Sequence, residues 1–223
     1  MENSLVNTEL EHLPNQIPIF PLTGVLLLPG GKLPLHIFEP RYIKMVESAL
    51  GSGRWFGMIQ PYQGNRETVS DNHPLFDTGC LGRIKTFSET DDGRYLLTVI
   101  GVCRFKIKKE LPKTSSFRKV IPNYEKFARD LESQKLTTSE RKRLSHTIQQ
   151  YFKERGHEID WESIKQTPDE MFVASIAMAC PFNPTEKQAL MEAPDLSALT
   201  ACLIAILKIA EYDNNSKFNS VSH

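Results

Sequence analysis

Two glycines followed by a lysine, Gly30-Gly31-Lys32, form the segment of this chain most suggestive of phosphate binding. A P-loop requires the pattern GxxxxGK followed by Ser or Thr, because its backbone and lysine surround the phosphates while its hydroxyl binds magnesium. Leu26 stands where the first glycine is needed, and Leu33 stands where the hydroxyl is needed. The pattern therefore does not predict a nucleotide site, and we interpret the glycines as turn residues of a hairpin.

Residues for covalent or metal chemistry are also poorly spaced. Nucleophilic catalysis needs a Ser, Cys or Thr beside a base, yet Ser175 and Ser197 fall within helical apolar patterns. The histidines form neither HxH nor HxxxH, and no cysteine pair has CxxC spacing, so no metal site is predicted. We therefore predict no catalytic residue, no metal and no cofactor. An enzyme whose Cys and His meet only through the fold is kept as an alternative.

The cysteines and the chain composition indicate a cytoplasmic protein. The four cysteines sit among apolar neighbours, which predicts small buried side chains in a reducing compartment; they are Cys80, Cys103, Cys180 and Cys202. The first residues are polar and acidic, unlike a signal peptide. The apolar run Ala201–Ala210 is too short to span a bilayer and contains Lys208. No membrane association is expected.

A polar cluster interrupts an apolar stretch at a predicted strand-to-helix junction. It consists of His36, Glu39, Arg41 and Tyr42. These residues are the candidate peptide- or partner-binding site. The competing interpretation is structural: Glu39 meets the partial positive charge of the helix start, and Arg41 pairs with a carboxylate.

A second group of residues has the composition of a nucleic-acid surface. Its basic members are Arg83, Lys85, Arg104, Lys106 and Lys108, and its aromatic members are Phe87, Tyr95 and Phe105. Alternation along Gly101–Lys108 predicts that the basic side chains face solvent while Phe105 faces the core. Stacking and charge then lie on opposite faces. Lys plus Arg also equals Asp plus Glu at 27 each, so RNA binding ranks as an alternative.

The first half of the chain has strand patterns. They cover Ile17–Leu22, Leu33–Phe38, Trp55–Gln60, Cys80–Glu89, Arg94–Ile100, Gly101–Lys108 and Val120–Phe127. Pro40 begins a helix that ends before Gly51. Residues 61–78 are predicted to be a polar loop, and Asp92-Gly93 to be a hairpin turn.

After about residue 130 the apolar period changes to that of helices. Predicted capping boxes pair Thr137 with Glu140, Thr167 with Glu170, and Asn183 with Glu186, and Asp195 is expected to cap the last helix. The predicted organisation is a disordered lead-in at 1–16, a β-rich part at 17–128, a helical bundle at 129–212 and a flexible tail at 213–223.

Three blocks of sequence, in this order, resemble the amino-terminal substrate-binding domain of the Lon protease family in its small stand-alone form. They are PLHIFEPRY at Pro34–Tyr42, GRIKTFSETDDGRYLLTVIG at Gly82–Gly101 and EKQALMEAPDL at Glu186–Leu196. The resemblance implies an α+β fold, with an amino-terminal PUA-like β pseudo-barrel followed by a carboxy-terminal helical bundle. The small-residue stretch that carries the Ser–Lys pair of Lon peptidases has no counterpart here.

The resemblance therefore implies a non-enzymatic module that binds unfolded or apolar peptide segments or partner proteins. A role as an adaptor or regulator in protein quality control follows as an expectation, with neither ATP hydrolysis nor peptide cleavage. The expected binding surfaces are the groove between barrel and bundle, the 61–78 loop and the Arg41–Tyr42 corner. The alternatives are an RNA-binding PUA-like domain and a small enzyme with an unrecognised site.

Overall fold

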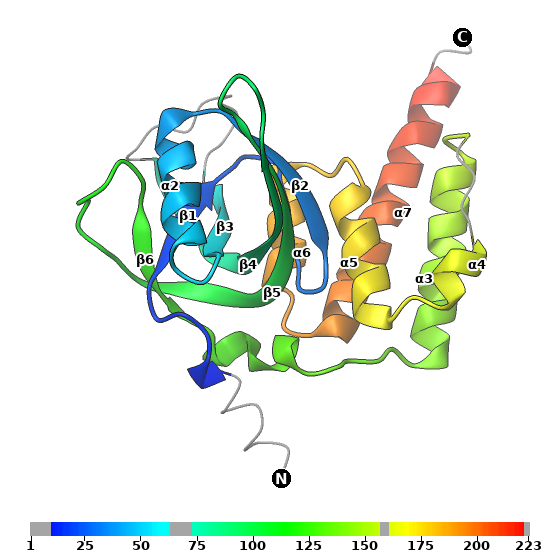
Figure 1. Cartoon of the computed structure of the whole chain (residues 1–223). Helices are drawn as coiled ribbons and strands as arrows, with labels where there is room; N and C mark the ends of the chain where they lie inside the picture. Colours follow the sequence, from blue (N-terminus) through cyan, green and yellow to red (C-terminus); the bar gives the residue numbers. More distant parts are fainter. Residues whose placement is uncertain (1–9, 63–72, 157–160, 221–223) are drawn as a thin grey trace.

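The computed structural model describes residues 10–62, 73–156 and 161–220, and its strands precede its helices (Figure 1). In this part of the chain, six strands form one sheet with the order β2-β5-β4-β3-β1-β6. Their bounds are β1 Ile17–Pro21, β2 Lys32–Ile37, β3 Trp55–Pro61, β4 Leu75–Glu89, β5 Tyr95–Glu110 and β6 Lys119–Asn123. The predicted strand positions are confirmed apart from shifts at the ends and two differences. The predicted strands Arg94–Ile100 and Gly101–Lys108 are one continuous strand, β5, and the predicted strand Val120–Phe127 stops at Asn123, before a 3₁₀ segment.

The sheet curls because β6 pairs on one side with β1 and on the other with the end of β5. The hairpin of β4 and β5 turns at Gly93, whose φ of +74° suits glycine. Strand β2 pairs with β5 alone among the described strands, so the pseudo-barrel is not a closed ring of all six strands. This arrangement confirms the predicted fold class.

The predicted hairpin at Gly30-Gly31 is wrong. Strand β1 pairs with β3 in parallel and with β6, whereas β2 pairs with β5. The connection from β1 to β2 contains Leu26, Leu27 and Leu28, which are all buried in the core. An apolar connection of this kind crosses the interior, and local turn residues cannot reveal that.

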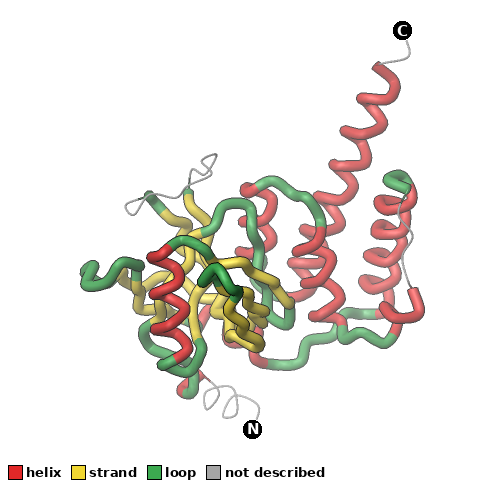
Figure 2. The backbone as a smooth tube through the Cα atoms, turned by 45° about the horizontal axis from the view of Figure 1, so that its top comes forward, coloured by secondary structure: helices red, strands yellow, loops and turns green. Residues whose placement is uncertain are grey.

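Seven helical segments are described. They are α2 Pro40–Leu50, the 3₁₀ segment η1 Glu125–Leu131, α3 Thr138–Lys153, α4 Trp161–Lys165, α5 Asp169–Ala179, α6 Pro184–Glu192 and α7 Leu196–Ser220. Figures 1 and 2 show α3, α5 and α7 grouped beside the barrel, while α6 packs against β4. Helix α7 stays helical to Ser220, where the sequence predicted a tail from residue 213.

Two of the three predicted capping boxes form. The side chain of Thr137 accepts from the Glu140 amide, and that of Asn183 accepts from the Glu186 amide, each with the reciprocal bond. The Thr167–Glu170 box is wrong, because Pro168 is the N-cap and Thr167 therefore lies outside the helix. Asp195 caps α7 as predicted, through a 2.9 Å bond from the Ala198 amide.

The hydrophobic core joins the barrel to the bundle. One continuous cluster contains Leu28 and Phe56 from the barrel together with Phe172, Leu199 and Leu203 from the bundle. A smaller cluster at the other end of the barrel includes Ile19, Phe105 and Phe127. The two parts share buried apolar surface, which contributes about 25 cal/mol for each Å² removed from water.

None of the helices within the described residues is long and apolar enough to cross a bilayer. No cluster of three or more His, Cys, Asp or Glu side chains that could hold a metal ion occurs within the described ranges.

We predict that Gly101→Ala destabilises the fold by about 1–3 kcal/mol, because the added methyl group would collide with the carbonyl oxygen of Leu28. Gly51→Ala is the matched control, since its φ of −76° suits alanine and its nearest atoms lie 3.8 Å away. Urea unfolding of both variants measures the difference. Equal stability of the two variants would contradict the proposed close approach of β5 to the β1–β2 connection.

Candidate functional site

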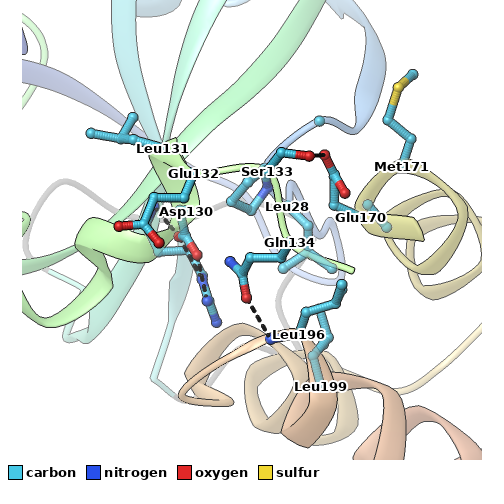
Figure 3. Close-up of a pocket in the computed structure, with 14 residues that line it drawn as sticks. Leu28, Asp130, Leu131, Glu132, Ser133, Gln134, Glu170, Met171, Leu196 and Leu199 are labelled. Atoms are coloured by element: carbon cyan, nitrogen blue, oxygen red, sulfur yellow. Dashed lines mark hydrogen bonds and ion pairs between the residues drawn. The ribbon is translucent and has the colours of Figure 1, made fainter. Parts of the chain in front are cut away.

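A pocket of about 330 Å³ lies at the junction of barrel and bundle (Figure 3). Segments far apart in sequence line it: the end of the β1–β2 connection, residue 104 of β5, residues 130–134 at the end of η1 and just after it, and the N-terminal parts of α5 and α7. Its volume is at the lower end of the range of small-molecule sites, about 300–1,000 Å³. The pocket is therefore the structural counterpart of the groove that the sequence resemblance implied.

The base of the pocket is a buried ion pair between Arg104 and Asp130, whose side chains are each 3% exposed. Arg104 Nε donates to Asp130 Oδ2 at 2.8 Å, and Nη2 donates to Oδ1 at 2.6 Å. The same carboxylate accepts from the Arg104 amide at 2.9 Å. This bidentate geometry is the strong form of an Arg–carboxylate pair.

The remaining nitrogen of the Arg104 guanidinium reaches the bundle. Nη1 donates to the carbonyl oxygens of Met191, at 3.3 Å, and Ala193. The guanidinium also lies over the Phe127 ring, 4.5 Å from its centre. One side chain thus joins β5, η1 and the connection between α6 and α7.

The prediction that Arg104 faces solvent is wrong. Strand alternation correctly turns its side chain away from Cys103 and Phe105, but η1 and the α6–α7 connection cover that face of β5. Alternation shows which face a side chain takes, and it cannot show what packs on that face.

The predicted basic surface is broken up by other contacts as well. Lys106 pairs with Asp77 at 2.8 Å, and Arg83 lies over the Trp55 ring at 5.0 Å. Phe105 is fully buried. The basic and aromatic residues grouped from the sequence therefore do not form one surface of charge and stacking.

Apolar side chains form the pocket walls. Leu28, Ala174, Leu196 and Leu199 are buried, and Met171 is half-buried. Gly30 brings the chain close to α5: its φ is +74°, and a Cβ there would lie 3.3 Å from Met171 Cγ. Gly30 was the sequence signal for this close approach, but from the sequence it was interpreted only as a turn residue.

Polar side chains from the segment after η1 define the opening. Ser133 Oγ donates to Glu170 Oε1 at 3.5 Å, and Glu132 is exposed beside it. Gln134 accepts from the Leu196 amide at 3.2 Å and donates to the Arg129 carbonyl oxygen at 2.8 Å. Figure 3 shows these side chains around the apolar walls. Such a surface suits non-covalent binding of an apolar group.

The sequence-predicted residues lie together at another corner of the barrel. His36 is exposed, with its ring 5.9 Å from that of Phe38. Arg41 Nε donates to Glu39 Oε2 at 3.0 Å, as the structural interpretation predicted, and its guanidinium lies 4.5 Å from the centre of the Tyr42 ring. Tyr42 is only 5% exposed. None of the four predicted residues lines the barrel–bundle pocket.

The 61–78 loop falls largely outside the described residues, in the range 63–72. Leu75–Thr78 belongs to β4 instead of a loop. Leu75 pairs with Pro61 of β3 and Thr78 pairs with Lys106 of β5, which the polar residues before them obscured in the sequence.

The cysteines are free thiols. Burial is confirmed for Cys80, Cys103 and Cys180, whereas Cys202 is half-buried. Burial raises the pKa of the Cys180 thiol to about 11 and raises the pKa of Cys80 and Cys103 as well. The thiolate is the reactive form of cysteine. At neutral pH these side chains are therefore protonated and poorly suited to nucleophilic catalysis.

Comparison with known proteins gives a consistent result. The family model described as the ATP-dependent protease La (LON) substrate-binding domain matches residues 16–208. The Lon protease of Desulfosudis oleivorans is 26% identical over 102 residues, which cover 46% of this chain and 12% of that protein. The Lon protease of Anaeromyxobacter dehalogenans is 28% identical over 109 residues, which cover 49% and 13%. The match thus spans about an eighth of these relatives.

Two solved structures share the fold. The Lon N-terminal domain protein from Xanthomonas campestris has a TM-score of 0.62 at 19% identity. The N-terminal domain of the Mycobacterium avium complex Lon protease has a TM-score of 0.61 at 15% identity. Each match covers 86% of this chain and 98% of the other.

We predict that Arg104→Met lowers the free energy of unfolding by about 3–5 kcal/mol, because it leaves the buried Asp130 carboxylate without its partner. Adding Asp130→Leu should recover much of this loss, since the double variant buries no charge at this point. A double-mutant cycle in urea measures the coupling. Purely additive losses would show that the pair does not hold the junction.

Proposed function

Because this chain belongs to the Lon substrate-binding domain family, we propose that it binds exposed apolar segments of protein chains in the pocket between barrel and bundle. The observation that carries the proposal is the pocket itself, with buried leucines on its walls and a polar opening. Burial of an apolar side chain there would supply the binding energy. A role as an adaptor or regulator in protein quality control is part of the same proposal.

The shape of the site supports a segment that inserts side chains. Strand addition at the free edge of β2 is less favourable, because Pro34 in the middle of β2 has no N–H to donate. The proposed mechanism therefore relies on the pocket.

We expect Ser133→Trp to weaken binding at least about 10-fold, or about 1.4 kcal/mol, because Ser133 lines the opening and an indole would fill it. The probe is a short fluorescein-labelled peptide with Leu-Phe-Leu between Gly and Ser residues. Its binding is measured by fluorescence anisotropy. A peptide with Asn in place of the apolar residues tests specificity.

Ser139→Trp is the matched control, because Ser139 is exposed on α3 and does not line the pocket. Circular dichroism should show the same fold for both tryptophan variants. Unchanged peptide affinity of the Ser133→Trp variant would contradict binding in the pocket.

The corner of His36, Glu39, Arg41 and Tyr42 is the alternative proposed surface for the same function, and binding in the pocket predicts that the corner contributes little. We expect His36→Ala combined with Arg41→Ala to change peptide affinity by no more than about two-fold, because Arg41 already contacts Glu39 and the Tyr42 ring. Alanine is used at these two positions because Tyr42 is buried and its loss would disturb the core. A loss of binding with an intact fold would make this corner the principal surface.

A further inference from the structure

We propose that the pocket selects apolar segments that carry Lys or Arg next to the apolar side chain, and that Glu132 and Glu170 recognise this cation. The inference rests on the proposed function and adds the class of segment that is bound. It follows from the charges of the side chains that line the pocket.

Four charged residues line the pocket. Arg104 and Asp130 neutralise each other in the buried ion pair at its base. The other two, Glu132 and Glu170, are both acidic. Arg129 and Lys135 flank the same segment of chain but do not line the pocket. The charge that an occupant meets at the opening is therefore negative.

The two carboxylates are available to an occupant. Glu132 is exposed and Glu170 is half-buried. Glu170 Oε1 accepts a 3.5 Å hydrogen bond from the neutral Ser133 hydroxyl, and the partial positive charge of the α5 N-terminus offsets the charge of Glu170 only in part. Across the described ranges, no Lys or Arg lies within ion-pair distance of either carboxylate. A cation supplied by the bound segment would provide the missing partner.

The size and layout of the pocket fit this class of segment. Its volume of about 330 Å³ is roughly twice that of an engineered cavity of about 150 Å³ that takes up benzene, so one aromatic or two aliphatic side chains can enter. Glu132 comes from the segment after η1 and Glu170 comes from α5, which are separate walls of the pocket (Figure 3). The long stems of Lys and Arg can lie along apolar surface while their charges reach these carboxylates.

The same charges discriminate against acidic segments. An Asp or Glu beside the inserted side chain would face two like charges at the opening, which disfavours binding. Selection of this kind depends on salt, because partly exposed charges are screened within about 8–10 Å at ordinary ionic strength. The apolar contribution does not share that dependence.

Three fluorescein-labelled peptides test the proposal. All have Leu-Phe-Leu at the centre, and the flanking residues are Lys, Gln or Glu. We expect the Lys peptide to bind about five-fold more tightly than the Gln peptide at low salt, with the Glu peptide weakest, as two partly exposed ion pairs would give. Glu132→Gln combined with Glu170→Gln should make the affinities of the Lys and Gln peptides about equal. The two substitutions keep the shapes of both side chains and an acceptor for Ser133.

Glu11→Gln combined with Glu89→Gln is the matched control, because it removes the same charge from residues outside the pocket. This control variant should keep the Lys preference. Equal affinity of the three peptides for the unmodified protein, or a preference that survives the Glu132/Glu170 change, overturns charge selection. In that case Ser133→Trp still reports on the proposed function. Absence of binding by all three peptides overturns both proposals.

Discussion

The buried pair of Arg104 and Asp130 is the interaction on which the junction of barrel and bundle depends. Removing two charges from water is costly, and such a pair persists only when its hydrogen-bonding groups are satisfied. Here the carboxylate accepts three bonds from one residue, while the guanidinium also reaches two carbonyl oxygens of the bundle. The pair therefore fixes where the chain leaves η1 and where α7 begins. Those two points are also the positions from which the pocket is built.

The pocket is a consequence of this junction and of close backbone approach. Gly30 lets the β1–β2 connection pass beside Met171, and Gly101 lets β5 pass beside Leu28. Gln134 then holds the segment after η1 against the start of α7. The close approach at these two glycines and the hydrogen bond of Gln134 thus fix the positions of the apolar walls relative to one another. The pocket is therefore preformed, and under the proposed function this would lower the entropy cost of binding a flexible segment.

The sequence predicted the elements better than the site. Periodicity located the strands and the change to helices, and the Asn183 and Thr137 boxes located two helix starts, because these are local effects. The burial of Arg104 was missed, since it depends on η1 and on a connection almost ninety residues later in the chain. The pocket was foreseen only as a groove implied by the family resemblance. Its residues come from segments that no spacing rule connects, whereas the His36–Tyr42 corner was visible because its residues are contiguous.

The most direct test is photo-crosslinking of the full chain with a peptide probe that carries benzoylphenylalanine between two leucines. The crosslinked residues are then located by mass spectrometry of proteolytic fragments. The central claim is that an apolar side chain enters the pocket between barrel and bundle. It predicts crosslinks to Met171, Leu199 and the segment 131–134, all suppressed by excess unlabelled Leu-Phe-Leu peptide. Crosslinks concentrated at His36, Phe38 or Leu96, with none in the pocket, would contradict it.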